Sequence, residues 1–260
     1  MMERVVVVRD RLVHTSLALA RIMDIGGDFE RALALAEDTK KRASHESAHE
    51  RMHATYFVMA LLYRLGRWSE IVPLIGEHLA AFEEETVDMN CPFTRSGPAV
   101  GALVLERLGN DEAARNAESR IVPNDKQPGL VEAWMAERAL LNGHPGEARE
   151  IAERILAFGR GASIEEPPYE LAVLVEALAA LKDWPALASI LPAARGRSGY
   201  VVWLAPAIDR AEAARLDAEG DDEGARAALD RALATYRRLG MDAEVALTQE
   251  RLAGMAERTI

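Results

Sequence analysis

Hydrophobic residues recur along most of the chain at steps of three and four positions, the period of an amphipathic helix. Near the N-terminus, Leu12, Leu19, Ile22 and Met23 form one such stripe over residues 9–25. The helical runs come in pairs, and a short polar hinge separates the two members of each pair. The one β-branched run is a set of four valines near the start of the chain. The pattern therefore predicts an all-helical protein of about thirteen helices.

The hinges share a pattern of residue types. The clearest copy runs from Gly220 through Asp221 to Ala225. The glycine of this copy corresponds to Gly27, Gly66, Gly109, Gly143 and, in a degenerate copy, Lys182. Seven positions before these markers stand Ala20, Met59, Ala102, Ala136, Val175 and Ala213. We expect the paired helices to touch at these residues, and a pattern that returns roughly every forty residues is typical of a stacked helical array.

The expected architecture is a single domain over residues 1–260, folded as an α-α superhelix of about six helical hairpins with a C-terminal capping helix. A stacked array grows by adding hairpins, so a chain of this length needs no second core. The predicted hairpins cover residues 9–42, 47–85, 98–120, 130–158, 169–194 and 200–239. Residues 242–255 are predicted to form the helix that covers the last apolar face.

Composition and charge narrow the classes of function. Charged residues make up 28% and apolar residues 49% of the chain, which is typical of a soluble protein. The net charge of -11 opposes a general affinity for nucleic acid or for an anionic membrane. The single cysteine, Cys91, cannot form an internal disulfide, and no apolar run approaches the roughly 18 residues of a membrane helix. We expect a cytoplasmic protein that has no cofactor and is not an enzyme.

The hinge and its alanine positions resemble the tetratricopeptide repeat over nearly the whole chain. The ending, with Ala225, Leu229, Tyr236 and Leu252 among its apolar positions, resembles the C-terminal repeat region of large bacterial signalling ATPases. These include maltose-regulator-like transcription activators and regulators fused to adenylate cyclase domains. The resemblance implies a region that receives a regulatory signal or a partner for a transcriptional or cyclase-type output. The chain contains no G-x-x-x-x-G-K-[ST] loop, so it lacks the phosphate cradle of such ATPases.

One pentapeptide matches the H-E-x-x-H pattern of zinc hydrolases. In that pattern His45 and His49 would hold the ion and Glu46 would activate water, while His53 adds a third imidazole. The overlapping residues 47–50 match a capping box, which starts a helix there and leaves His45 in the preceding loop. We therefore expect no catalytic or tightly held zinc. A zinc-dependent hydrolase remains a remote alternative, and adventitious metal binding by these histidines stays open.

The residues expected to bind a partner lie on the first helices of the hairpins, at positions that face the inside of a repeat array. The leading candidates are Tyr56, Tyr63, Arg64, Arg107, Glu137, Tyr169 and Arg210, and the same projection includes His14. Tyrosine offers contact area at small entropic cost and arginine pairs with carboxylates, so these residue types suit a protein or peptide segment.

Two alternatives to a peptide-binding scaffold stay open. A small-molecule effector sensor would need a deep and partly apolar pocket. Self-association into a homo-oligomer would use an end or the convex face of the array. Because substitutions at exposed positions change stability by less than about 0.5 kcal/mol, we expect the pair Arg64→Glu and Arg107→Glu to leave the melting temperature nearly unchanged.

Overall fold

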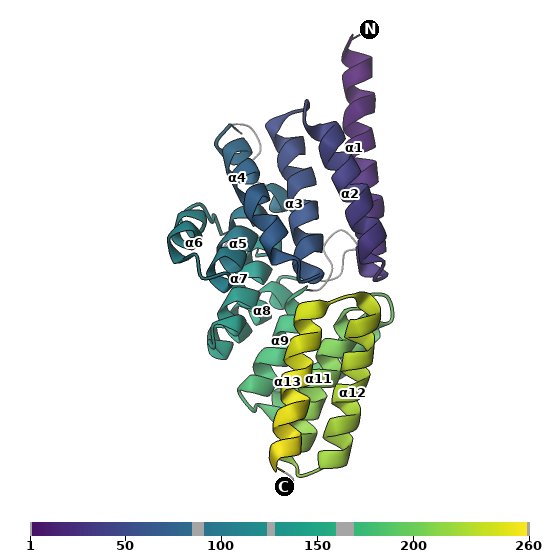
Figure 1. The fold of residues 1–260 in the computed structure, drawn as a ribbon, viewed down its shortest axis with the longest axis vertical. Helices are drawn as coiled ribbons and strands as arrows, with labels where there is room; N and C mark the ends of the chain where they lie inside the picture. The colour runs from purple at the N-terminus through teal and green to yellow at the C-terminus, as the bar shows by residue number, and fades with distance from the viewer. Residues whose placement is uncertain (1, 85–90, 124–127, 160–168, 259–260) are drawn as a thin grey trace. The chain divides into compact units, whose positions relative to one another are not determined.

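The computed structural model describes the backbone of residues 2–84, 91–123, 128–159 and 169–258, and the side chains in these ranges from residue 13 to residue 256. Within these ranges the chain forms thirteen α-helices and no strand, which confirms the all-α prediction (Figure 1). The helices are α1 (Met2–Ile25), α2 (Phe29–Ala43), α3 (Ala48–Arg64), α4 (Trp68–Glu84), α5 (Pro92–Arg107), α6 (Asp111–Glu118), α7 (Leu130–Leu141), α8 (Pro145–Ala157), α9 (Tyr169–Ala180), α10 (Trp184–Ser198), α11 (Leu204–Ala218), α12 (Asp222–Leu239) and α13 (Asp242–Arg258). None of the described helices is both long enough and apolar enough to cross a membrane.

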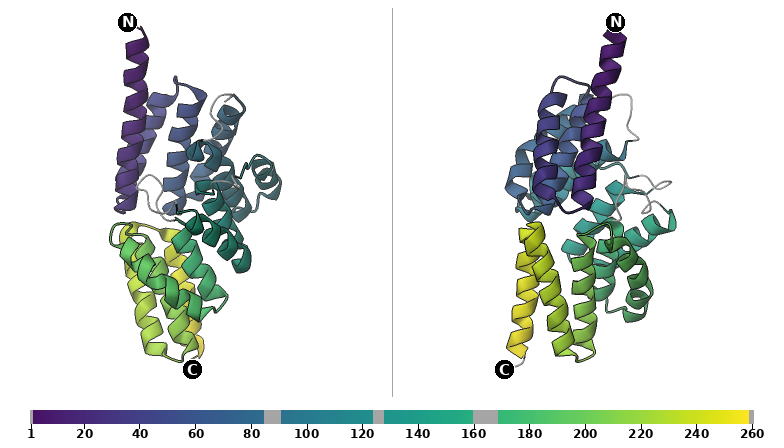
Figure 2. Two further views of the ribbon diagram at one scale, coloured as in Figure 1. Left: turned by 180° about the vertical axis from the view of Figure 1, so that it is seen from behind. Right: turned by 90° about the vertical axis from the view of Figure 1, so that its right-hand side faces the viewer.

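The chain divides into two compact units. The first comprises Met1–Asp24 and Asp28–Trp134, and the second comprises Ile25–Gly27 and Met135–Ile260. In the first unit, α3 packs against α2, α4 and α5. In the second unit, α9 packs against α8, α10 and α11, and α12 packs against α11 and α13 (Figure 1 and Figure 2). Helices within a unit thus contact their neighbours in sequence, while the expected single repeat domain over residues 1–260 stays a prediction.

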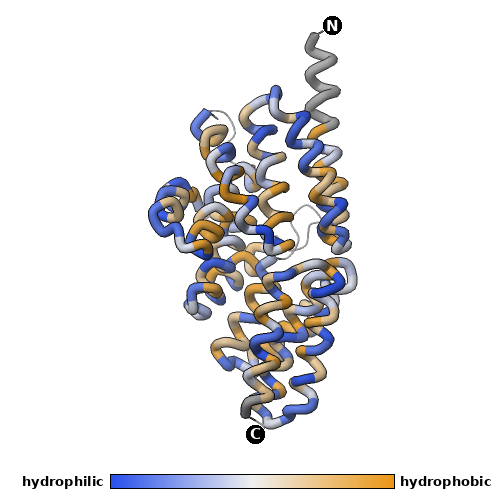
Figure 3. The backbone as a smooth tube through the Cα atoms, in the orientation of Figure 1, coloured by the Kyte–Doolittle hydropathy of each residue, from blue (hydrophilic) through white to orange (hydrophobic). Residues whose placement is uncertain are grey.

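Small residues line the contacts between paired helices, as the sequence pattern predicts. The residues seven positions before the hinge markers are all buried, and Ala20, Met59, Ala102, Ala136 and Val175 are 0% exposed. The hinge alanines are buried as well, namely Ala32, Ala114, Ala148 and Ala225. Hydrophobic and hydrophilic residues are interspersed along the helices (Figure 3). A methyl group at the contact lets two backbones approach closely while its own surface is removed from water.

The hinges share one backbone geometry, in which the marker residue is left-handed. The glycine markers have φ between 72° and 80°, and Lys182, with φ 56°, is the one non-glycine residue of the described chain at positive φ. The residue after each marker donates its N–H to the carbonyl five positions earlier, as in Asp221 to Leu216 at 2.9 Å and Asp183 to Leu178 at 3.0 Å. This is the Schellman arrangement, which pairs carbonyls that a helix end would otherwise leave unpaired.

The residue after the marker also begins the second helix in several hinges. Asp221 accepts a hydrogen bond from the N–H of Gly224 at 2.9 Å, and Asp183 accepts one from Ala186 at 3.2 Å. Asn110 makes the corresponding bond to Ala113 at 3.3 Å. One short polar side chain therefore caps the second helix while its backbone closes the first, which explains why Asp or Asn follows the marker.

Replacing Lys182 by glycine should raise the free energy of unfolding by about 0.5–1 kcal/mol. The left-handed backbone costs a residue with a side chain about 1–2 kcal/mol, and the larger entropy of glycine in the unfolded chain offsets part of the gain. Urea unfolding of the two proteins measures the difference. As a control, Gly109→Ala should destabilise through φ alone, since an added Cβ there meets no atom within 4 Å. An unchanged midpoint for Lys182→Gly would contradict a strained turn at this hinge.

Two helices begin earlier than the sequence predicts. Helix α1 begins at Met2 and so includes the four valines, because valine costs a helix at most about 0.7 kcal/mol per residue relative to alanine. Helix α5 begins at Pro92, where the missing N–H of proline costs nothing. The expected start, Pro98, lies inside the helix. The other hairpins agree with their expected bounds to within a few residues, and residue 85 lies outside the described residues.

A histidine compensates for the proline inside α5. Pro98 has no N–H to donate to the carbonyl of Thr94, four positions earlier. Nε2 of His78, from α4, donates to that carbonyl at 2.8 Å. Burial lowers the pKa of the His78 imidazole from 6.5 to about 4, although the hydrogen bond to Thr94 opposes this shift. A neutral, buried histidine therefore satisfies the carbonyl that Pro98 leaves without its helical partner.

Candidate functional site

The seven residues predicted to bind a partner are divided between the two units. Tyr56, Tyr63, Arg64 and Arg107 belong to the first unit, and Glu137, Tyr169 and Arg210 belong to the second. Those of the first unit lie on α3 and α5, and those of the second unit lie on α7, α9 and α11. All seven lie on the first helices of hairpins, as the sequence numbering indicates. Their exposure, however, differs widely.

Two of the predicted residues of the first unit are interior. Tyr56 is 0% exposed, and its hydroxyl accepts a hydrogen bond from Nε1 of Trp134 at 3.0 Å. The side chain of Arg64 is 10% exposed, and its Nε lies 3.3 Å from a carboxylate oxygen of Asp24. The expectation that both side chains face a groove is wrong, because neighbouring helices cover these positions. Arg64→Glu would also place two carboxylates together, so it should lower stability and not leave it unchanged.

Arg210 of the second unit is also interior. It lies at the centre of a buried ionic network formed by four helices. Its Nε donates to Glu176 at 2.7 Å, a second nitrogen donates to Glu244, and its guanidinium lies 4.9 Å from the ring centre of Tyr236. Glu176 also accepts from Arg251 at 3.1 Å. Burial alone would raise the pKa of Glu176, but the charges of Arg210 and Arg251 outweigh it and lower that pKa. The expected partner contact at Arg210 is therefore a structural link between α9, α11, α12 and α13.

Two predicted residues, Tyr63 and Arg107, come together with a tryptophan near the surface. The ring of Tyr63 stacks on that of Trp68, with centroids 6.0 Å apart and an interplanar angle of 19°. The guanidinium carbon of Arg107 lies 5.4 Å from the centre of the Trp68 ring. Tyr63 and Trp68 are half-buried and Arg107 is exposed. We call these three residues the aromatic–arginine surface.

The sequence pattern does not predict Trp68 as a binding residue. It is the first residue of α4, directly after a hinge, whereas the projection considered only first helices. The sequence does mark the position of Trp68. It is the second residue after the hinge glycine Gly66, the place that follows aspartate or asparagine in several other hinges. Of the remaining candidates, Tyr169 stacks on Trp203 with centroids 5.2 Å apart, and Glu137 is half-buried.

The H-E-x-x-H pentapeptide does not form one helical turn. His45 lies in the turn between α2 and α3, and α3 begins at Ala48. The predicted capping box is confirmed: the Ser47 hydroxyl accepts from the N–H of Glu50 at 3.3 Å, and Glu50 accepts from the N–H of Ser47 at 3.2 Å. His45 and His49 therefore do not share a helical face.

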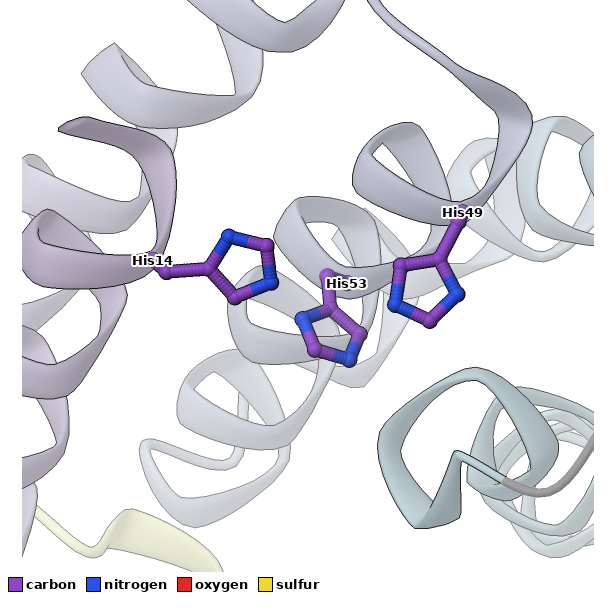
Figure 4. A group of neighbouring side chains, drawn as sticks. All are labelled: His14, His49 and His53. Carbon is purple, nitrogen blue, oxygen red and sulfur yellow. The ribbon is translucent and has the colours of Figure 1, made fainter. Parts of the chain in front are cut away.

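A different histidine completes a cluster with the other two. His14 of α1 lies beside His49 and His53 of α3, and one ring nitrogen of each residue lies within 4.8 Å of those of the others. The ring centroid of His53 is 5.3 Å from that of His14 and 4.6 Å from that of His49. Figure 4 shows the ring of His53 between the other two. We call these three residues the histidine cluster.

The members of the histidine cluster differ in burial. His14 is exposed, His49 is half-buried and His53 is buried. Burial lowers the pKa of the His53 imidazole from 6.5 to about 3, and the neighbouring His49 and His14 lower it as well. His53 is therefore neutral at physiological pH. Its Nε2 lies 2.7 Å from the sulfur of Cys91, a half-buried residue at the start of α5.

Comparison with known proteins does not extend these observations. No protein-family model matches the chain, and a search of curated proteins finds no match. The resemblance to tetratricopeptide repeats and to the repeat region of signalling ATPases therefore rests on the residues quoted for it. What the chain does has to be inferred from the aromatic–arginine surface and from the histidine cluster.

Proposed function

We propose that this chain is a non-catalytic scaffold that binds a protein or peptide segment, folded as an α-α superhelix of about six hairpins that α13 closes. Support for the repeat array comes from the shared left-handed hinges and from the packing of consecutive helices within a unit, such as α2 on α3 and α11 on α12. Arrays of this kind bind extended partners along their helices. The aromatic–arginine surface is the observation that carries the binding role.

The aromatic–arginine surface has the chemistry of a binding hot spot. Tryptophan, tyrosine and arginine are the residue types that contribute most to the affinity of protein interfaces. Trp68 donates from Nε1 to the carbonyl of Tyr63 at 3.2 Å, so the aromatic pair is held in place before a partner arrives. Within the described part of the chain, Arg107 makes no ion pair. Its guanidinium covers one face of Trp68 and is available to pair with a carboxylate, which favours an acidic segment.

We infer that binding of the partner segment serves regulation. The resemblance of the chain's ending to the repeat region of bacterial signalling ATPases supports a signal-receiving or partner-binding region of a transcriptional or cyclase-type regulator. In such a regulator, a peptide bound to the repeats would change how they engage the output domain. This part of the proposal rests on Ala225, Leu229 and Tyr236 and their neighbours in the sequence.

Selection of peptides from a random display library on the purified full chain tests the proposal. The enriched peptides should be acidic, and their affinity should fall by about tenfold or more on Arg107→Glu, since attraction becomes like-charge repulsion. Arg226→Glu is the matched control, because Arg226 is an exposed arginine on α12 and its replacement makes the same change in net charge. Circular dichroism and the melting temperature should show that both variants keep the fold.

Three results would oppose a peptide role for this surface. Equal affinities of the Arg107→Glu and Arg226→Glu variants would place the peptide elsewhere. If the enriched peptides contained no acidic residues, the proposed pairing of Arg107 with a carboxylate of the partner would be wrong. A chain that enriches no peptide but whose melting temperature rises with a small metabolite would favour the effector sensor.

A further inference from the structure

We propose that His14, His49 and His53 bind one divalent transition-metal ion, with Zn²⁺ as the ion that fits best. The inference goes beyond the peptide-binding proposal and does not depend on it. This proposal departs from the sequence-based prediction of no tightly held zinc, which rests on the capping box that separates His45 from His49 and His53. The structure replaces His45 with His14, which comes from a different hairpin.

The donor set and its geometry both fit zinc. Three imidazole nitrogens are a donor set that zinc accepts, and a fourth position is then left for water. Two nitrogens on a tetrahedral zinc ion lie about 3.4 Å apart, because each Zn–N bond is about 2.1 Å long. The ligand atoms of the cluster lie within 4.8 Å of one another, so modest rotations of the side chains bring them to the required separation. His14 is exposed, so its side chain has room for such a rotation.

The two ring nitrogens of His49 have different surroundings. Nδ1 of His49 is removed from solvent and has no hydrogen-bond partner among the described residues. Buried polar atoms of this kind are rare in folded proteins, and an unsatisfied one in a native structure calls for a ligand, an ion or a water. Figure 4 shows the other nitrogen of His49, Nε2, on the side of the ring that faces His53, whereas Nδ1 lies on the far side. Nε2 is therefore the ligand atom that His49 offers to an ion between the three rings.

His53 is already oriented as a metal ligand would be. Its Nε2 faces the sulfur of Cys91 at 2.7 Å, which leaves Nδ1 for the ion. A histidine that binds a metal nearly always has its other ring nitrogen held by a neighbouring group, which fixes the tautomer and the orientation of the ring. Cys91 therefore acts as a positioning residue for His53, and the three imidazoles hold the ion.

The metal would link two hairpins of the first unit. His14 lies on the first helix of the first hairpin, and His49 and His53 lie on the first helix of the second hairpin. An ion held between them would tie α1 to α3 directly. Because the ion binds the folded chain, it should stabilise the fold by mass action, as any ligand specific for the native state does.

Metal-free full-length protein, prepared with a chelator and then freed of it, should be titrated with Zn²⁺ by calorimetry. We expect one ion per chain, and a melting temperature raised by about 5–10 °C at a hundredfold excess over the dissociation constant. His14→Ala should weaken binding by at least about tenfold, since even the loss of a group that only orients a ligand costs 10–100-fold. His14 is exposed, so this variant should fold, whereas His53→Ala removes a buried side chain and needs circular dichroism as a check.

His45→Ala is the matched control. His45 is an exposed histidine close to the cluster in sequence but outside it, so the variant should bind one ion with unchanged affinity. Cys91→Ser should also keep one ion per chain. The proposal is wrong if zinc does not bind stoichiometrically, if His14→Ala binds as tightly as the parent, or if His45→Ala or Cys91→Ser loses the ion.

Discussion

Replacing Arg210 by alanine should destabilise the protein by about 3–5 kcal/mol, the largest effect expected for any single substitution discussed for this chain. The variant leaves Glu176 buried, with Arg251 as its remaining cationic neighbour among the described residues. It also removes the charge that faces Glu244 and the ring of Tyr236. The buried carboxylate of Glu176 then keeps only the partly exposed Arg251 as its counter-charge, and a buried charge that loses a partner costs more than the original pair contributes. Urea unfolding followed by circular dichroism measures the change.

Arg231 offers a matched control in the same unit. Its side chain is 55% exposed, and it pairs with Asp209 at 3.2 Å. Exposed ion pairs contribute about 0–1 kcal/mol, so Arg231→Ala should change stability by no more than that. If Arg210→Ala and Arg231→Ala had the same small effect, the network around Arg210 would not hold the four helices together, and Arg210 would again be a candidate for partner binding.

Lowering the pH from 6.5 to 4 should cost the protein about 3 kcal/mol through His78 alone. The pKa of His78 is about 4 in the folded chain and about 6.5 when unfolded, so between these values the unfolded chain binds more protons. Stability is therefore fully present above pH 6.5 and falls as the pH drops toward 4. Unfolding curves in urea at half-unit pH intervals, with a chelator present, measure this slope.

His78→Gln separates the contribution of His78 from that of the histidine cluster. Glutamine cannot take up a proton in this range, and its amide can donate to the Thr94 carbonyl that Pro98 leaves unpaired. His53 also has a lowered pKa and contributes to the slope in both proteins. The variant should therefore show a shallower loss of stability between pH 6.5 and pH 4 than the parent. An identical slope would show that His78 is not buried in its neutral form.

Sequence alone predicts the hinges well because their causes are local. A left-handed residue after a helix favours glycine, and the following Asp or Asn caps the next helix within four positions. Lys182 was recognised as a degenerate marker from its spacing, and its φ of 56° confirms that it takes the same conformation. The capping box at Ser47 is local in the same sense, and it correctly separated His45 from α3.

The binding residues were harder to predict because exposure depends on packing between hairpins. Tyr56 and Arg64 occupy positions that look outward on an isolated hairpin, yet Trp134 and Asp24 contact them in the folded unit. The histidine cluster is a contact between positions far apart in the sequence, so no local pattern placed His14 beside His49. A spacing rule gives the period of the array, but not which side chains the next helix covers.

A double-mutant cycle between Arg107 and an acidic residue of a selected peptide tests the binding role most directly. The cycle needs four dissociation constants. The parent and the Arg107→Ala variant are each titrated with two peptides, the selected peptide and its variant in which alanine replaces that acidic residue. If the guanidinium beside Trp68 pairs with the carboxylate, the two substitutions should couple by about 1 kcal/mol or more. A coupling energy of zero for every acidic position of the peptide, with Arg107→Ala folded as the parent, would contradict binding at the aromatic–arginine surface.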